Sequence, residues 1–228
     1  MEKIVVLTGA GMSADSGLKT FRDSDGLWEG HEISQVATPQ AWERDRELVL
    51  DFYNQRRKQA CEADPHRGHQ ALAELEEKYE VTIITQNVDS LHERAGSTDV
   101  VHLHGELSKV RSEEDPSLIY DIGGEAVEVG DTAEDGAQLR PHVVWFGEPV
   151  PRMQKASAIV PEADILMVIG TSLVVYPAAG LTDLARPGIP KYIIDPANPE
   201  LVDYSGWKHI RKTAEKGTPP LASELLDR

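Results

Sequence analysis

The residues most suggestive of chemistry form a glycine-containing turn near the N-terminus. Residues 9–14 read GAGMSA, which matches G-x-G-x-x-G/A directly after the apolar run KIVVLT (3–8). Small residues at such a turn let the backbone approach a pyrophosphate, and the helix that follows presents unpaired N–H groups to it. A tight strand–helix turn can look the same, but the position after the first strand favours a nucleotide site.

Polar clusters follow three further apolar runs: TQNVDSLH (85–92), HLHGE (102–106) and GTSLVVYP (170–177). Turn formation accounts for most Asn, Asp and Gly residues at strand ends. Four clusters on one predicted edge of a sheet favour a site instead, because ligands of parallel sheets bind where the strands end. Asn and Asp can orient a carboxamide or a water, and a histidine can take a proton from a hydroxyl near neutral pH.

Two histidines compete for the role of base. His104, beside Gly105, is the first candidate. His102 shares its face by the period-two alternation of a strand and is the rival.

The elements that must position these residues alternate along the chain. Short β-branched runs, apolar nearly throughout, predict strands covered on both faces, as in a parallel sheet, at 3–8, 81–85, 100–104, 142–146, 165–170 and 191–195. Apolar residues at three- and four-residue spacings predict helices at 39–63 and 65–79, with shorter ones at 151–160, 176–186 and 219–227. This alternation predicts an α/β fold, a Rossmann-like parallel sheet with helices on both faces.

Two segments fit the alternation poorly and predict a smaller inserted lobe. Residues 23–38 are polar and contain glycine, and residues 108–140 are acidic and rich in turn residues, with a hairpin expected around Gly123 and Gly124. We expect a ligand cleft between this lobe and the sheet. The usual dinucleotide-binding unit would place a second strand within about 30 residues. Here the second strand begins near Val81, which does not favour a hydride-transfer dehydrogenase.

The charge, hydropathy and cysteine content of the chain limit the kinds of partner that it can bind. The net charge is −16, from 39 acidic and 23 basic residues. Such a surface repels nucleic acids and suits cationic partners, or it serves solubility alone. No apolar stretch approaches the roughly 20 residues of a membrane span, and the opening MEKIVVL leaves no room for a signal peptide, so we expect a cytoplasmic protein. A single cysteine, Cys61, excludes an internal disulfide and a multi-cysteine zinc site.

In their order and spacing, five strings resemble those of the sirtuins, the NAD-dependent protein lysine deacylases: GAGMSADSG followed by FR, TQNVDSLH, HLHGE, the V-x-F-G-E string within HVVWFGE (142–148), and GTSLVVYP. The resemblance covers roughly residues 4 to 220. It implies one catalytic domain over residues 1–228, with a Rossmann-like core (about 1–22, 80–107 and 141–228) and a small lobe (about 23–79 and 108–140).

The resemblance also implies roles for individual residues. NAD would contact Gly9, Ala10, Gly11, Ser13, Phe21, Arg22, Gln86, Asn87, Asp89, Gly170, Thr171, Ser172, Asp195 and Ala214. His104 would be the general base, with Asn87 also catalytic. The substrate peptide would pair as an added strand with residues 143–148, among them Val144, Phe146 and Gly147.

The chemistry implied by the resemblance consumes NAD. The acyl oxygen attacks the ribose carbon as nicotinamide leaves, and His104 takes a proton from a ribose hydroxyl, giving lysine, nicotinamide and O-acyl-ADP-ribose. An ADP-ribosyltransferase or NAD hydrolase on the same scaffold, an oxidoreductase and a non-catalytic NAD-binding module are the alternatives. The expected partners are acyl-lysine proteins, with no direct contact to nucleic acid or membrane.

The chain departs from the sirtuin pattern in its zinc ligands. The family has four cysteines between the HG and FGE motifs, whereas residues 106–142 contain none. We therefore expect no zinc and a lobe held by packing and hydrogen bonds. Asp195 stands where the family often has Asn.

A tyrosine–arginine pair in DFYNQRRKQ (51–59) indicates which kind of acyl group the protein removes. Tyr53 and Arg56 are three apart on one helix face, and an arginine fork beside a phenol suits a carboxylate. Class III sirtuins use a Y-x-x-R pair in this region to recognise succinyl- or malonyl-lysine, and Thr20 also resembles that class. The alternatives are a core tyrosine with a surface arginine, or Arg57 in place of Arg56.

Overall fold

The computed structural model describes residues 1–18, 27–28, 31–201 and 203–228. Its centre is a six-stranded parallel sheet in the order β11-β10-β9-β1-β4-β5. The strands are β1 (Lys3–Thr8), β4 (Glu80–Thr85), β5 (Val100–His102), β9 (Ile165–Ile169), β10 (Lys191–Ile194) and β11 (Trp207–Ile210). The α/β class expected from the sequence is confirmed. The chain leaves β1 towards β4 and returns to its other side at β9, so the strand order reverses at β1, where parallel sheets bind ligands.

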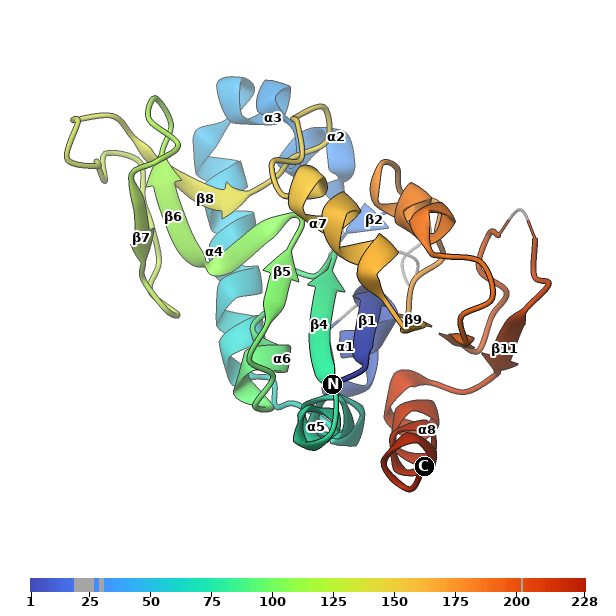
Figure 1. The fold of residues 1–228 in the computed structure, drawn as a ribbon. Coiled ribbons are helices and arrows are strands. Elements are labelled where there is room, and N and C mark those ends of the chain that lie inside the picture. Colours follow the sequence, from blue (N-terminus) through green and yellow to red (C-terminus); the bar gives the residue numbers. More distant parts are fainter. Residues whose placement is uncertain (19–26, 29–30, 202) are drawn as a thin grey trace.

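Helices cover both faces of this sheet (Figure 1). Ile4 and Val6 point to one face, where they share a core with α5 (Arg67–Glu74), η2 (Leu75–Glu77) and α8 (Ala214–Leu226). Val5 and Leu7 point to the other face, towards α7 (Met153–Ile159), η3 (Val160–Glu162) and η4 (Ala178–Leu184). Successive strand residues face opposite sides, so a strand buried on both sides is apolar at every position.

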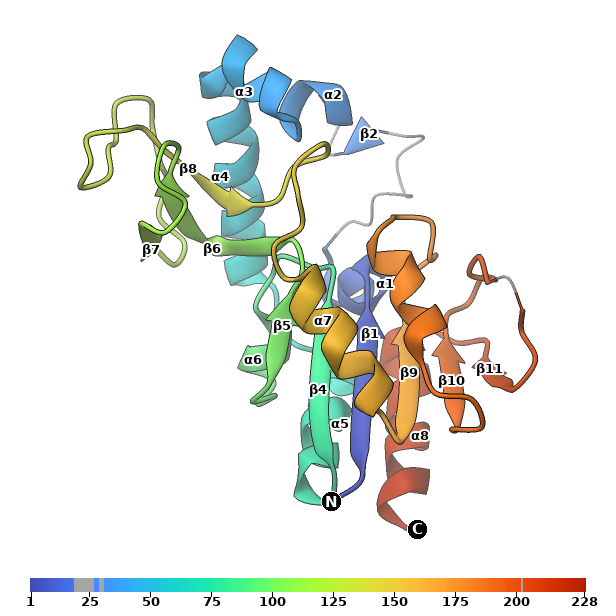
Figure 2. The same cartoon turned by 45° about the horizontal axis from the view of Figure 1, so that its top comes forward.

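A smaller lobe stands above the carboxyl ends of the strands (Figure 2). It combines an antiparallel sheet in the order β7-β6-β8 with three helices: α2 (Ile33–Val36), α3 (Pro39–Arg44) and α4 (Arg46–Glu62). Its strands are β6 (Gly105–Ser112), β7 (Ile119–Asp121) and β8 (Leu139–Val143). Short elements complete the described chain: α1 (Ala10–Ser13), η1 (Ala14–Ser16), β2 (Leu27–Trp28), β3 (His31–Glu32) and α6 (Leu91–Arg94).

Several elements differ from the sequence-based expectations. The helix expected over 39–63 breaks at Asp45, whose carboxylate accepts from Leu48 N and begins α4. The strand expected at 142–146 is β8, which pairs with β6 in the small sheet rather than with the parallel sheet. The hairpin connection joins β6 to β7 before the two glycines at 123–124. α5, which the sequence assigned to the small lobe, packs in the core of the parallel sheet instead.

The small lobe is held by partly buried hydrogen bonds and by its own apolar core. The Ser112 hydroxyl donates to Asp135 Oδ2 (2.6 Å) and accepts from the backbone N–H groups of Glu114 and Asp115. Asn54 of α4 exchanges two hydrogen bonds with the backbone of Val127. Among the described residues, no group of three or more His, Cys, Asp and Glu side chains is arranged to hold a metal ion. No helix in this part of the chain is long and apolar enough to cross a membrane.

Candidate active site

A cavity of about 620 Å³ is lined by residues at the ends of the parallel strands and by residues of the small lobe. Most of the site residues expected from the sequence line it. From the strand ends come Gly9, Ala10, Gly11, Ser13, Gln86, Asn87, Asp89, His104, Gly170, Thr171, Ser172 and Asp195. From α4 and the segment after β8 come Tyr53, Arg56, Val144, Phe146 and Gly147.

Two glycine turns pack against each other at the carboxyl ends of β1 and β9. Gly170 has φ +61°, and a Cβ there would lie 2.3 Å from Met12 N, so only glycine fits. Gly11 N donates to Gly170 O (2.8 Å), and a Cβ on Gly11 would lie 2.8 Å from Gly170 Cα. The small residues therefore bring two distant polar strings into one wall of the cavity.

The sequence did not indicate three buried histidines behind the glycine turn. His66 Nε2 donates to Met12 O (2.7 Å) and His66 Nδ1 accepts from Gly68 N, while His92 Nε2 contacts the Thr8 hydroxyl at 3.2 Å. His69 lies between them, with ring centroids 4.2 Å from His66 and 5.0 Å from His92. Burial lowers the pKa of His69 to about 2 and that of His92 to about 3, so both stay neutral and hold the turn by hydrogen bonds and packing.

His104 has the geometry of a neutral base. Its Nδ1 lies 3.0 Å from the backbone oxygen of Gln86. A carbonyl oxygen can only accept, so Nδ1 carries the proton and Nε2 keeps its lone pair. Burial lowers the pKa of His104, and the hydrogen bond to Gln86 opposes this only in part. The ring therefore remains neutral at physiological pH.

The rival histidine, His102, is committed to structure. Its Nδ1 lies 3.0 Å from Asn87 O, and its Nε2 lies 2.7 Å from Glu93 Oε1. Burial by itself would lower the pKa of His102, but the hydrogen bond and ion pair with Glu93 raise it overall. A ring with both nitrogens engaged and its charged form favoured is a poor base.

A buried network joins the first glycine turn to the QNVD string. Asn87 Nδ2 donates to the Ser13 hydroxyl (3.0 Å), which donates to Asp89 Oδ2 (2.9 Å). Burial raises the pKa of Asp89, although Leu91 N and Ser13 donate to its carboxylate and lower it in part. Gln86 Nε2 donates to Thr171 Oγ1 (3.1 Å), which links this network to the second turn.

Tyr53 and Arg56 face the cavity from one side of α4, whereas Arg57 does not. The Tyr53 hydroxyl accepts a hydrogen bond from Trp145 Nε1 (3.1 Å). The Arg56 guanidinium lies 5.7 Å from the ring centroid of Phe52. Arg57 is only 1% exposed, and its guanidinium donates to Leu107 O, Asn54 Oδ1 and Glu125 O. The alternative register, with Arg57 at the cavity, is therefore wrong.

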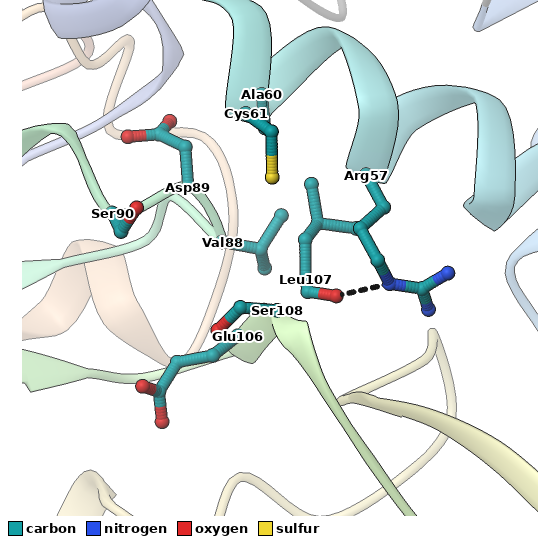
Figure 3. A pocket seen from close by; sticks show the side chains of 9 residues that line it. All are labelled: Arg57, Ala60, Cys61, Val88, Asp89, Ser90, Glu106, Leu107 and Ser108. Atoms are coloured by element: carbon teal, nitrogen blue, oxygen red, sulfur yellow. Dashed lines mark hydrogen bonds between the residues drawn. The ribbon is translucent and has the colours of Figure 1, made fainter. Parts of the chain in front are cut away.

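A smaller hollow lies directly beside the cavity (Figure 3). Its volume of about 20 Å³ is room for about one water. The guanidinium of Arg57 points away from Cys61 there, towards Leu107 O. The hollow and the cavity share four lining residues: Ala60, Val88, Asp89 and Leu107.

Among the expected NAD contacts that the structure describes, one does not line the cavity. Ala214 is buried at the start of α8, beside α5, and is not among the lining residues. Phe21 and Arg22, together with Thr20, lie outside the described residues.

The fold and the cavity define a nucleotide-binding α/β protein with a neutral histidine at its ligand site. Residues 9–177 match the Sir2 family. An NAD-dependent protein deacylase of Bacteroides thetaiotaomicron is 52% identical over 231 residues, covering 99% of each chain. One of Helicobacter pylori is 57% identical over 196 residues, covering 86% of this chain and 85% of its own.

Solved structures agree with these sequence relatives. A Sir2 homologue bound to ADP-ribose has a TM-score of 0.91 at 38% identity, covering 99% of this chain and 92% of its own. A Sir2 homologue bound to NAD has a TM-score of 0.89 at 38% identity, covering 99% and 90%. The chain belongs to the Sir2 family, which confirms the resemblance to sirtuins.

Proposed function

We propose that this protein is an NAD-dependent protein lysine deacylase that favours acyl groups ending in a carboxylate, such as succinyl and malonyl. One observation carries the proposal: a neutral histidine, two glycine turns and a tyrosine–arginine pair line the same cavity. Its relatives from Bacteroides thetaiotaomicron and Helicobacter pylori bear the name NAD-dependent protein deacylase.

The volume of the cavity and the residues that line it both suit NAD. A volume of about 620 Å³ lies within the range of small-molecule sites. The turns at 9–11 and 170–172 offer backbone and small side chains for phosphates and the adenosine half, and Asp195 at the end of β10 can accept from ribose hydroxyls. Gln86, Asn87 and Asp89 would line the nicotinamide ribose, joined by Phe21 and Arg22 as the resemblance to sirtuins implies.

The bound dinucleotide supplies an electrophilic ribose carbon when nicotinamide leaves. His104 would accept a proton at Nε2 from a ribose hydroxyl, because its other nitrogen is held by Gln86 O. Asn87 and Asp89 are buried in the cavity wall, which would keep water away from this part of the site. Asn87, fixed by Ser13, would orient the groups around the ribose.

The substrate peptide would lie along the segment after β8. Val144, Phe146 and Gly147 line the cavity, and the Phe146 ring is 45% exposed. An extended peptide added beside this segment would carry its acyl-lysine into the cavity. The net charge of −16 favours basic protein segments over nucleic acids, whose phosphates it repels, and we expect the enzyme to act on cytoplasmic proteins.

The proposed preference for succinyl and malonyl over acetyl groups, here called the acyl choice, rests on Tyr53 and Arg56. Both residues lie where the cavity meets α4. A planar guanidinium can bind a carboxylate through two hydrogen bonds, and a neutral phenol can donate a third. An acetyl group has no carboxylate to receive these bonds. The pair would therefore stabilise succinyl and malonyl substrates selectively.

Arg56→Met tests the acyl choice. Hydrogen bonds to a charged group are worth about 1.5–3 kcal/mol, so we expect desuccinylation kcat/KM to fall about 10- to 100-fold, and deacetylation far less. Rates are measured by mass spectrometry on matched succinyl- and acetyl-lysine peptides with NAD. Lys58→Met, which removes a positive charge from an exposed position of the same helix, is the control. Equal losses on both peptides would contradict the proposed acyl choice.

A further inference from the structure

Trp145, which lines the cavity beside Tyr53, holds the hydroxyl of that tyrosine. Its indole N–H donates to the phenol oxygen at 3.1 Å, and both side chains are only 2% exposed. Within the part of the chain that the structure describes, this is the one hydrogen bond of the Tyr53 hydroxyl. The oxygen therefore already accepts, and the hydroxyl proton is left to be given to another group.

The indole is itself fixed on several sides. The Arg140 guanidinium stacks over the Trp145 ring, 3.4 Å from its centroid, and binds Glu148 through two nitrogens at 2.8 and 3.2 Å. Glu148 Oε2 also accepts from Trp145 N (2.8 Å). The Trp42 ring packs on the remaining side, with centroids 5.7 Å apart. A buried ring clamped in this way keeps its N–H in one direction.

We propose that Trp145 is a positioning residue for acyl selection, which fixes the Tyr53 hydroxyl as a hydrogen-bond donor to the carboxylate of the acyl group. The inference rests on the proposed function and deepens it. An ionised carboxylate only accepts hydrogen bonds, so a phenol that rotated to present its lone pairs would repel it. The indole N–H of Trp145 binds the lone pairs of the Tyr53 oxygen. The hydroxyl then keeps the one orientation in which its proton points towards the carboxylate.

The environment keeps the phenol in the donating form. Burial raises the pKa of Tyr53, and Arg56 and Trp145 offset this only in part. Tyr53 therefore stays protonated across the physiological range. Phe52 packs edge-on against its ring at 5.1 Å, which further limits rotation of the side chain.

Trp145→Phe removes the indole N–H while keeping an aromatic ring in the core. The matched control is Trp42→Phe, because Trp42 lies in the same aromatic cluster but donates its N–H to Glu113 Oε2 (3.0 Å). The probes are succinyl-lysine and butyryl-lysine peptides of one sequence, whose acyl chains have the same number of carbons and differ in the carboxylate. The readout is the ratio of kcat/KM for the two peptides.

We expect Trp145→Phe to lower the succinyl-to-butyryl ratio about fivefold, mainly through a higher KM for the succinyl peptide, since one neutral hydrogen bond is worth about 1 kcal/mol. Trp42→Phe should leave the ratio unchanged. In a Tyr53→Phe background, adding Trp145→Phe should lower the ratio no further, because the indole then has no phenol to orient.

Three results would overturn the inference. One is a ratio that Trp145→Phe leaves at the wild-type value, and another is an equal fall in Trp42→Phe. The third is a second, independent fall in the double variant, which would mean that Trp145 does not act through Tyr53. A wild-type enzyme with no preference for succinyl over butyryl would instead contradict the proposed acyl choice, and the inference with it.

Discussion

Two features of its surroundings suit His104 to the role of a base: a hydrogen bond to a backbone carbonyl, and burial. The carbonyl of Gln86 fixes the proton on Nδ1, and burial keeps the ring neutral. His102, two residues earlier, has the opposite character because Glu93 favours its charged form. Of these two histidines, only His104 therefore has the properties expected of the proposed base.

The pH dependence of turnover tests this division. Only neutral His104 can accept a proton, and burial lowers its pKa, so kcat should stay constant as the pH falls to about 6.5, the ordinary histidine pKa, and decline only below it. His104→Ala should cost about 100-fold or more in kcat. An acid limb centred above the ordinary histidine value, or an active His104→Ala variant, would contradict the assignment.

At the residue scale, the sequence predicted the polar groups that belong to short strings and missed those that depend on packing. Asn87, Asp89 and His104 follow strand ends, so the parallel topology alone brings them to one edge. His66 and Trp145 act through partners far away in the chain, Met12 and Tyr53, which no local spacing reveals. Ala214 was expected at NAD but is buried at the start of α8, against α5.

At the scale of elements, hydrogen bonds tie the strands of the small lobe to the connections between them. The buried Ser112 side chain ties β6 to the segment before β8 through Asp135 and caps two further backbone N–H groups. Gln138 binds the backbone of Gly130, Glu128 and Leu139 within the same lobe. We expect these bonds to stabilise the lobe without a metal ion, because residues 106–142 contain no cysteine.

Ser112→Ala tests that account of the lobe. Removing the buried Ser112 hydroxyl leaves Asp135 Oδ2 and two backbone N–H groups without their partner, so we expect a loss of about 1–3 kcal/mol in unfolding free energy. Ser117→Ala is the matched control, because Ser117 is exposed although its hydroxyl also donates to an aspartate of this lobe. Chemical denaturation measures both, with and without a zinc chelator. Unfolding of the wild type by the chelator would contradict a metal-free lobe.

The elements that the sequence predicted well are those buried on both faces. β1, β4, β9 and β10 form where apolar runs were found, because a strand covered on both sides is apolar at every residue. In β6 and β11, apolar residues alternate with polar or charged ones. Their sequences therefore resembled those of polar loops. β8 was assigned to the wrong sheet, since HVVWF does not reveal that it pairs with β6.

At the scale of the whole molecule, the cavity lies between the parallel sheet and the small lobe. The parallel sheet supplies rigid strand ends at the point where the strand order reverses, and the small lobe supplies α4 and the segment after β8. Gly105 joins them: its φ of +84° and its contact with His142 O leave no room for a side chain. The proposed base and the proposed acyl-selecting pair therefore come from separate bodies that meet at one site.

The most direct test of the central claim is product analysis of one reaction containing NAD and a succinyl-lysine peptide. We expect free lysine peptide, nicotinamide and O-succinyl-ADP-ribose in equal amounts by mass spectrometry, and none of them with His104→Ala. Nicotinamide released with free ADP-ribose, or with an ADP-ribosylated protein, while the lysine keeps its acyl group, would show an NAD hydrolase or ADP-ribosyltransferase and contradict deacylation.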